Sequence, residues 1–481
     1  MKMKKTGGMS FRPRMNVGCL FDIMTGRWVT GSHGESILNG GLAPFTGVGG
    51  PPNHFKSALS HYLNLTVVDR YRMVGPLPVD EDEDYPGATS QVYDTETTFD
   101  VTRLGDLKRH TQWLKDIDIG EAVDSGLISA YSKLDYFGEN WWSDLKDEMT
   151  RKTSEVKKYV SIPFLNKENK PYKIPKPDVV TMDSLTEFSI ENLEKLMDAN
   201  EIGHKNLNME AMIEMKAKSH MVRQLPSKTA ASGIFVIATA HVGEEHQLDP
   251  YAITPKKLLF LKGNAKFKRV PNQFNFLPND VYYIFSMKVL KNSSSKGPEF
   301  PTKRGGDFEN SPELQQVEVY NTRGKSGPTG FSFSLLMSQN EGLLPTMSEF
   351  LFLRKNKKYG IGGNDQNYYL ELVPDEKLSR TTVRDKVDNS YALRRAMHIS
   401  AEMCYMDQVG IGFDRELLCT PKELYEDIKK LGYDWAELLD TRDYWLPLEW
   451  ETKETKPFLS TMDLLRMRKG DYKPFWMAKK K

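Results

Sequence analysis

One segment near the amino terminus joins a Gly/Pro-rich turn to an apolar helix pattern. Residues 50–57 read Gly-Pro-Pro-Asn-His-Phe-Lys-Ser, and the apolar spacing after them predicts a largely buried helix beginning near Lys56. The segment follows the pattern G-x-x-x-x-G-K-[ST], except that Phe55 replaces the second glycine. In such a loop, backbone N–H groups cradle phosphates, the lysine neutralises their charge and the hydroxyl holds Mg²⁺.

The sequence therefore predicts a phosphate site on eight consecutive residues, with Lys56 facing the phosphates and Ser57 as a metal ligand. The full set is Gly50, Pro51, Pro52, Asn53, His54, Phe55, Lys56 and Ser57. The alternative is an ordinary Gly/Pro turn before a helix.

Short apolar and β-branched runs alternate with helical patterns behind this turn. Strands are expected at 91–93, 178–182, 234–240, 281–290, 316–320 and 331–336, and a helix at 209–224. Alternation of this kind favours an α/β fold with a mainly parallel central sheet flanked by helices. We expect an N-terminal segment at 1–35, a core at 36–350 and a mostly helical C-terminal unit at 351–481, where the composition becomes charged and aromatic.

Charge, cysteine content and hydropathy limit the kinds of site and the classes of protein that are possible. The formal net charge is +1, so any nucleic-acid site must be a local basic patch. Three widely separated cysteines lack zinc-ligand or disulfide spacing. No apolar stretch reaches the roughly 20 residues that a membrane span requires. A cytoplasmic protein is expected.

Polar residues at three strand ends could complete the phosphate site. Asp183 follows the 178–182 strand and could hold Mg²⁺. Glu96, with Asp94 as the substitute candidate, could act as the general base for an attacking water. His241 ends the 234–240 strand and could contact the terminal phosphate. The alternatives are a common strand ending, a helix cap and a structural histidine.

A basic stretch with interleaved phenylalanines follows His241. Cations along a groove bind phosphates and aromatic faces stack on unpaired bases, so this stretch is a candidate site for single-stranded DNA. The residues are Lys256, Lys257, Lys262, Lys266, Phe267, Lys268, Arg269 and Gln273. The alternative is a hairpin with core phenylalanines and solvated lysines. Lys216, Lys218, Arg223 and Lys228 form a weaker candidate, for which a solvated helix face is the favoured interpretation.

The order of these motifs resembles RecA-like recombinases, in particular the UvsX-type recombinases of tailed phages. The resemblance rests on Phe55-Lys56-Ser57, Asp94-Thr95-Glu96, Asp183-Ser184 and His241. It implies that Arg323 and Lys325 reach the γ-phosphate of a neighbouring subunit, the alternative being a solvated hairpin tip. DnaB-type helicases also resemble this region.

The expected function is ATP hydrolysis with Mg²⁺ between adjacent subunits on single-stranded DNA, as in strand exchange. Self-association into a filament or ring and a possible loader protein are expected partners. Two alternatives stay open: a hexameric DnaB-like helicase or translocase, and a nucleotide-gated assembly protein that does not bind DNA.

Overall fold

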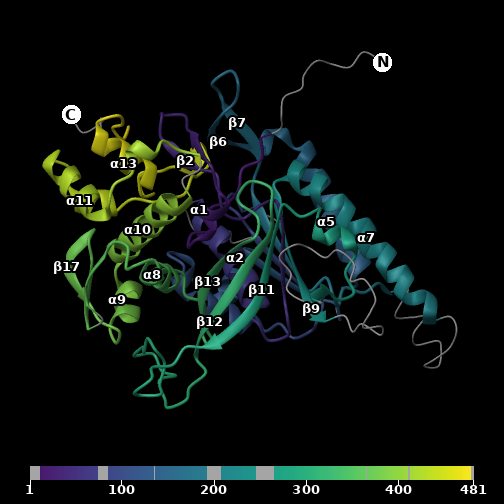
Figure 1. Ribbon diagram of the computed structural model, residues 1–481. Helices are drawn as coiled ribbons and strands as arrows, with labels where there is room; N and C mark the ends of the chain where they lie inside the picture. The colour runs from purple at the N-terminus through teal and green to yellow at the C-terminus, as the bar shows by residue number, and fades with distance from the viewer. Residues whose placement is uncertain are drawn as a thin grey trace, which may run out of the picture.

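The computed structural model describes residues 11–73, 85–134, 136–191, 207–244, 265–364, 366–409 and 412–477. A ten-stranded sheet forms its centre (Figure 1). In spatial order the strands are β14 (Gly342–Leu343), β13 (Phe331–Ser338), β12 (Leu314–Gly324), β11 (Asp280–Val289), β3 (Phe45–Gly50), β9 (Ile234–Glu244), β8 (Asp178–Asp183), β4 (Ser90–Asp94) and β5 (Ile128–Ser132), with β10 (Ala265–Phe267) beside β9.

Six neighbouring strands, from β11 to β5, run parallel. The strands β12, β13 and β14 extend this sheet in antiparallel pairs, and β10 pairs antiparallel with β9. The mixed α/β fold with a mainly parallel sheet, expected from the sequence, is confirmed. Because parallel strands bring their carboxyl ends to one edge, the residues that follow β3, β4 and β8 meet there, beside His241 of β9, which pairs with Gly50 at the end of β3.

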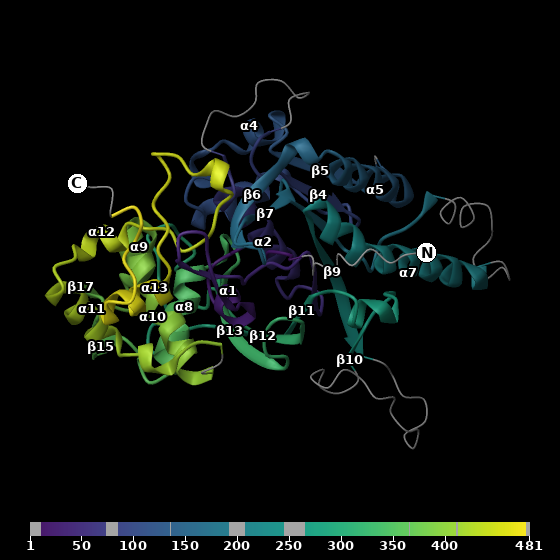
Figure 2. The same cartoon turned by 90° about the horizontal axis from the view of Figure 1, so that it is seen from above.

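Helices cover both faces of the parallel sheet, and consecutive residues of its strands alternate between two buried clusters. Val179 and Ile237 pack in the cluster that contains α2 (Lys56–Arg70). Val180 and Val236 pack in the other cluster, with α5 (Gly138–Ser154) and α7 (Leu207–Ser232). Burial on both faces explains why these strands are continuous apolar runs in the sequence. In Figures 1 and 2, α5 and α7 lie together on the side away from the C-terminal helices.

Buried polar contacts fix α2 against the sheet. The Asn64 side chain donates a hydrogen bond to Thr181 Oγ1 at 2.8 Å and accepts one from Ser90 Oγ at 2.5 Å. Since Thr181 lies on β8 and Ser90 on β4, one side chain joins the helix to two strands. This contact holds the middle of α2 against the sheet.

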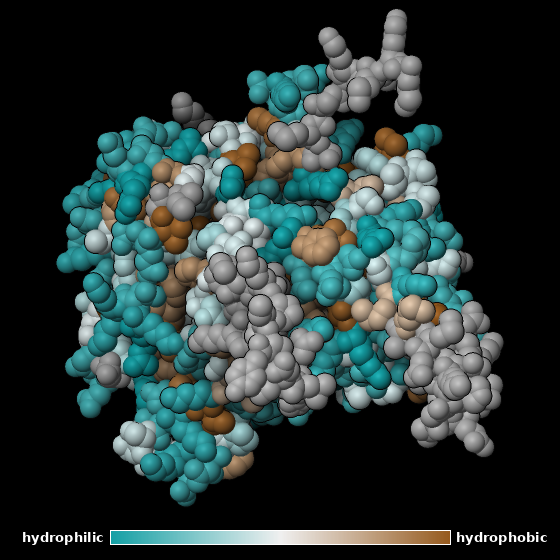
Figure 3. Space-filling view, turned by 45° about the vertical axis from the view of Figure 1, so that its right-hand side comes forward, coloured by the Kyte–Doolittle hydropathy of each residue, from teal (hydrophilic) through white to brown (hydrophobic). Residues whose placement is uncertain are grey.

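Smaller elements surround this core. They are α1 (Phe21–Thr25), β1 (Trp28–Thr30), β2 (Ser36–Leu38), α3 (Val101–Leu107), η1 (Lys108–His110), η2 (Leu114–Asp116), α4 (Ile119–Asp124), η3 (Val156–Lys158), β6 (Tyr159–Leu165), β7 (Pro171–Pro175) and η4 (Asn272–Asn275). The described part of the face in Figure 3 is mainly hydrophilic, with apolar side chains in separate small patches.

The predicted C-terminal unit, after β14, consists of helices with a small sheet. It comprises α8 (Pro345–Lys355), β15 (Ile361–Asn364), β16 (Asn367–Leu370), β17 (Val373–Leu378), α9 (Val383–Asn389), α10 (Tyr391–Val409), η5 (Arg415–Leu417), α11 (Pro421–Lys430), α12 (Trp435–Leu439), η6 (Leu448–Trp450) and α13 (Thr461–Lys469). The three-stranded antiparallel sheet β15–β17 was not expected from the sequence.

One hydrophobic cluster runs through all three predicted segments of the chain. It contains Met15, Leu63 and Leu465, and so joins residues before 36, between 36 and 350, and after 350. The Trp445 indole also donates to the Arg14 carbonyl at 2.9 Å. The boundaries at 35 and 350 therefore stay predictions about the sequence, because the packing there is continuous. Within the described ranges, no helix combines the length and apolar character that crossing a membrane would need.

Candidate phosphate and polyanion site

The turn between β3 and α2 has an unusual backbone. Gly50 ends β3, Lys56 begins α2, and Asn53 and Phe55 between them have φ values of 60° and 57°. These values lie in the left-handed region that glycine occupies most readily. Phe55 stands where the phosphate-loop pattern has its second glycine, so the backbone keeps the conformation that the missing glycine would favour. The Phe55 ring packs partly buried against the cluster that contains α2.

Lys56 lies at the first turn of α2 and is only 6% exposed. Its ammonium donates to the Pro51 carbonyl at 2.9 Å, which curls the loop around the lysine. Burial lowers the pKa of Lys56, while the carboxylates of Asp183 and Glu96 act in the opposite direction. The structure therefore brings the predicted phosphate-binding lysine within electrostatic reach of both predicted carboxylates. Ser57 follows on the exposed face of the helix.

Glu96 is held by Ser184, which follows β8, and by His241, which lies within β9 because that strand continues past its predicted end to Glu244. Its Oε1 accepts a hydrogen bond from Ser184 Oγ at 2.8 Å and lies 2.7 Å from His241 Nε2. The hydrogen bond with His241 is the largest influence on the pKa of Glu96 and lowers it, with Ser184 and Lys56 acting in the same direction against burial. At neutral pH this carboxylate is ionised, as a general base must be.

Asp94 has a different role, in the structure of the loop that follows β4. Its Oδ1 accepts from the N–H groups of Glu96 at 2.8 Å and Thr97 at 3.0 Å, and its Oδ2 accepts from Phe99 at 2.7 Å. Both oxygens are therefore occupied in shaping the loop that carries Glu96. Of the two acidic residues that the sequence offered as base, only Glu96 has its carboxylate beside Ser184 and His241.

Asp183 lies at the end of β8, directly opposite Asp94 in the register of β4. Its Oδ1 accepts a hydrogen bond from Thr239 Oγ1, and its carbonyl accepts from the Thr95 N–H at 2.8 Å. The Asp183 carboxylate and the Ser57 hydroxyl are hard oxygen donors, which fit Mg²⁺ shared with phosphate oxygens. Thr239 and Ser184 were not assigned as site residues from the sequence. Ser184 follows the end of β8 and Thr239 lies two residues before His241 in β9, so a hydroxyl close to a predicted site residue is the signal that could have indicated them.

A chain of contacts links His241 to the basic segment at 266–269. The His241 N–H donates to Thr186 Oγ1 at 2.8 Å, and the Lys268 N–H donates to the His241 carbonyl at 2.9 Å. Thr186 Oγ1 also donates to the Lys268 carbonyl at 3.4 Å. An open groove runs beside this chain, from Pro52 of the phosphate loop past His241 to Arg269.

Lys218, on α7, contacts the main chain at two residues of the groove, Thr186 and Arg269. Its ammonium is fully buried and donates to the carbonyls of Thr186 at 2.8 Å and Arg269 at 3.1 Å, while pairing with Glu214. The sequence interpretation of Lys218 as part of a solvated helix face is wrong, because the tertiary fold turns this residue inward. Lys216, two residues earlier on α7, is exposed.

The predicted DNA-binding residues divide into three groups. Lys256, Lys257 and Lys262 lie outside the described residues. Lys266, Lys268 and Arg269 are exposed on and after β10, at the end of β9 in Figure 2. Gln273 is half-buried in η4.

Phe267 requires a correction. It is only 5% exposed, its ring contacts Phe274 at a centroid distance of 5.3 Å, and it packs over Gly49, where an added Cβ would lie 2.2 Å from the ring. Stacking on a base needs an accessible ring face, so Phe267 is a core residue, as the alternative interpretation allowed.

Arg323 and Lys325 lie away from the phosphate loop of their own chain. Arg323 pairs with Val281 at the start of β11, which itself aligns with the beginning of β3. The phosphate loop follows the other end of β3, so the sheet separates the two cations from it. Arg323 Nε donates to the Pro278 carbonyl at 2.9 Å. Within one chain, Arg323 and Lys325 therefore do not lie beside the phosphate loop.

No protein-family model matches the sequence, and no curated protein matches it. Among solved structures, the chain is similar to the crystal structure of the RadB recombinase. The likeness has 14% sequence identity and a TM-score of 0.32, and it covers 63% of this chain and 92% of that chain. It is too distant to assign a function.

Proposed function

We propose that the chain is a RecA-like ATPase that hydrolyses ATP with Mg²⁺ and binds single-stranded DNA as a self-assembled oligomer, as a strand-exchange protein does. The observation that supports it most is the convergence of Lys56, Asp183, Glu96 and His241 at one edge of the parallel sheet. A cation at a helix amino end, an oxygen ligand for metal, a base and a polar sensor are the parts that phosphoryl transfer to water requires.

Each side chain has a distinct role in the proposed reaction. The free N–H groups of the first turn of α2 and the Lys56 ammonium neutralise the terminal phosphates. Ser57 and Asp183 would hold Mg²⁺, which supplies further charge neutralisation. Glu96 orients the attacking water and accepts its proton. His241 lies against Glu96, so loss of the terminal phosphate changes the surroundings of both residues.

Coupling to DNA follows from the contacts of His241. Thr186 and Lys268 join the main chain of His241 to the exposed cations Lys266, Lys268 and Arg269. A shift of His241 on hydrolysis would move this segment and alter its affinity for a polyanion. The position of Arg323 and Lys325 at the opposite edge supports hydrolysis between subunits.

ATPase assays with and without single-stranded DNA test the proposal, together with imaging of the assemblies formed with an ATP analogue. We expect DNA-stimulated turnover and open filaments. Lys56→Ala should abolish turnover, whereas Lys228→Ala, a lysine on α7 outside the site, should not change it. Wild-type turnover in Lys56→Ala would refute the site. Closed rings that unwind duplex DNA would favour the helicase, and DNA-independent ATPase would favour the assembly protein.

A further inference from the structure

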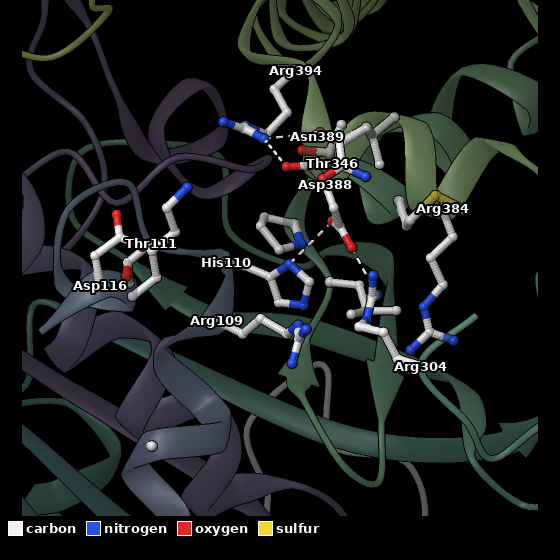
Figure 4. A pocket seen from close by; sticks show the side chains of 16 residues that line it. Arg109, His110, Thr111, Asp116, Arg304, Thr346, Arg384, Asp388, Asn389 and Arg394 are labelled. Carbon is white, nitrogen blue, oxygen red and sulfur yellow. Dashed lines mark hydrogen bonds and ion pairs between the residues drawn. The ribbon is translucent and has the colours of Figure 1, made fainter. Parts of the chain in front are cut away.

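A second polar cavity, of about 360 Å³, lies between α3–η1 and the C-terminal unit (Figure 4). Its walls are Gly105, Arg109 and His110 on one side, the start of α8 on another, and the junction of α9 and α10 on a third. None of the residues predicted for the phosphate site lines it.

The cavity lining carries an excess of positive charge. Five cationic side chains face two carboxylates, and His110 lies among them. The cations are Arg109, Lys115, Arg304, Arg384 and Arg394, and the carboxylates are Asp116 and Asp388.

The carboxylates near the cavity already form ion pairs with some of its cationic side chains. Arg384 pairs with Glu313 at 2.8 Å and with Glu341 at 3.0 Å. Arg304 Nη2 pairs with Asp388 at 2.7 Å and also lies 3.1 Å from Glu341, and its Nη1 lies 3.5 Å from Asp385. His110 bridges Glu341 and Asp388 at 3.4 Å each, as Figure 4 shows for Asp388. Arg304, Arg384 and His110 therefore each have a carboxylate partner, and Glu341 is shared by several cations.

Two arginines of the lining are not neutralised in this way. Arg394 Nη1 donates to the main-chain carbonyls of Val387 at 2.9 Å and Asp388 at 2.6 Å, and these are its hydrogen bonds among the described residues. Arg109 is half-exposed, and its one ion pair in the described chain is a 3.5 Å contact with the shared Glu341. Burial lowers the pKa of Arg394, and the attraction of Asp388 only partly offsets this effect. Among the described residues, the Arg394 guanidinium thus has carbonyl partners but no ion pair with a carboxylate.

The amino end of α8 adds further donors. The helix begins at Pro345 without a side-chain cap, and the next two residues, Thr346 and Met347, line the cavity. N–H groups in a first helical turn have no acceptor within the helix, and the helix dipole favours negative charge beside them. The Thr346 hydroxyl is a further donor on the same wall.

We propose that this cavity binds a phosphate-bearing small molecule with at least two negative charges, held by Arg109, Arg394 and the start of α8. Arginine suits such a ligand because its planar fork matches phosphate oxygens. The ligand would join the core to the C-terminal unit, since Arg109 belongs to η1 and Arg394 to α10. It would also stiffen α3, which follows the Glu96 loop by a few residues.

Calorimetric titration of the full chain with inorganic tripolyphosphate, without ATP, tests this site. Lys56→Ala removes the cation of the phosphate loop and should leave this binding within about threefold of the unmodified chain. Arg109→Gln and Arg394→Gln should each weaken it about tenfold or more, the loss of a charge-assisted hydrogen bond. Lys422→Gln is the charge-matched control, because Lys422 lies on α11 with a side chain that is 66% exposed. This variant should not change the affinity for tripolyphosphate.

Three results would overturn the proposal. The first is no binding of tripolyphosphate. The second is binding lost in Lys56→Ala but kept in Arg109→Gln, which would place it in the phosphate loop. The third is binding of single-stranded DNA alone through Arg109, which would make the surface part of a nucleic-acid site. Because Arg109 is exposed, Arg109→Gln should fold, and the test does not depend on Arg394→Gln alone. Circular dichroism would check that Arg394→Gln is folded.

Discussion

Glu96 Oε1 and His241 Nε2 lie 2.7 Å apart, although 145 residues separate them in the sequence. Glu96 comes from the loop after β4 and His241 from the far part of β9, and β8 runs between those strands. The contact joins the proposed base to the proposed sensor. It also connects the phosphate edge of the sheet with the basic segment beyond β9.

Glu96→Gln should separate nucleotide binding from hydrolysis. The amide keeps the size of the side chain but cannot accept a proton, so we expect turnover to fall by about 10²–10⁴-fold while ATP binding persists. Single-turnover hydrolysis and fluorescent-nucleotide binding measure the two effects.

Asp94→Asn is the matched comparison for that variant. Because the Asp94 oxygens hold three backbone N–H groups, this substitution should lower the melting temperature and also reduce activity. Normal turnover in Glu96→Gln together with selective loss in Asp94→Asn would transfer the role of base to Asp94.

His241→Ala should move the acid limb of the pH–rate profile to higher pH. In the wild type, the hydrogen bond from His241 holds the pKa of Glu96 below its ordinary value, so Glu96 stays ionised as the pH falls. The stabilising contribution of this carboxylate is present above its ordinary pKa and is lost as the pH falls through the lowered pKa. Single-turnover rates between pH 4 and 8 would show the shift, and an unmoved limb would contradict it.

Phe55→Gly and Phe55→Ala should differ in stability. At an ordinary helical position the alanine variant would be the more stable, and here we expect the reverse. Both remove the ring, but only alanine keeps a Cβ in the left-handed conformation, with φ 57° in this structure. The glycine variant should therefore be more stable than the alanine variant by about 1 kcal/mol. Chemical denaturation of both proteins measures the difference, and a more stable alanine variant would refute the assigned backbone.

Lys218→Met should uncouple DNA binding from hydrolysis while leaving DNA-free turnover within about twofold. The variant loses the donor that joins the Thr186 and Arg269 carbonyls, so stimulation by single-stranded DNA should fall by about fivefold or more, within the usual range of coupling free energies. Lys216→Met is the exposed control on the same helix, and Lys218→Arg should restore part of the coupling.

The ratio of DNA affinities with and without an ATP analogue provides a second readout of coupling, because a general loss of DNA affinity cancels in this ratio. If Lys218 couples the two sites, the factor by which an ATP analogue strengthens DNA binding should fall in Lys218→Met, and by linkage DNA should strengthen analogue binding by the same reduced factor. Full stimulation in Lys218→Met would show that this lysine is structural only.

Local sequence was enough to predict six strands of the central sheet and the buried helix α2, but not β3, β5, β10 and β14 of the same sheet. Residues 178–182 and 234–240 are continuous apolar runs because both faces of a central parallel strand are buried. The expected turn before Lys56 and the start of α2 there agree with the structure. The small sheet β15–β17 was missed, since its strands are short and its pairs are set by contacts with the surrounding helices.

What the sequence determined by itself was six strands of the central sheet and the polar residues near the ends of three of them, because hydrophobic periodicity is a local property. The tertiary structure alone decided that Asp94 supports the loop while Glu96 faces His241, since those roles depend on which atoms meet across strands. It alone turned Phe267 and Lys218 inward. A residue type states what a side chain can do, but burial and neighbours, contributed by distant parts of the chain, decide which of those uses is available.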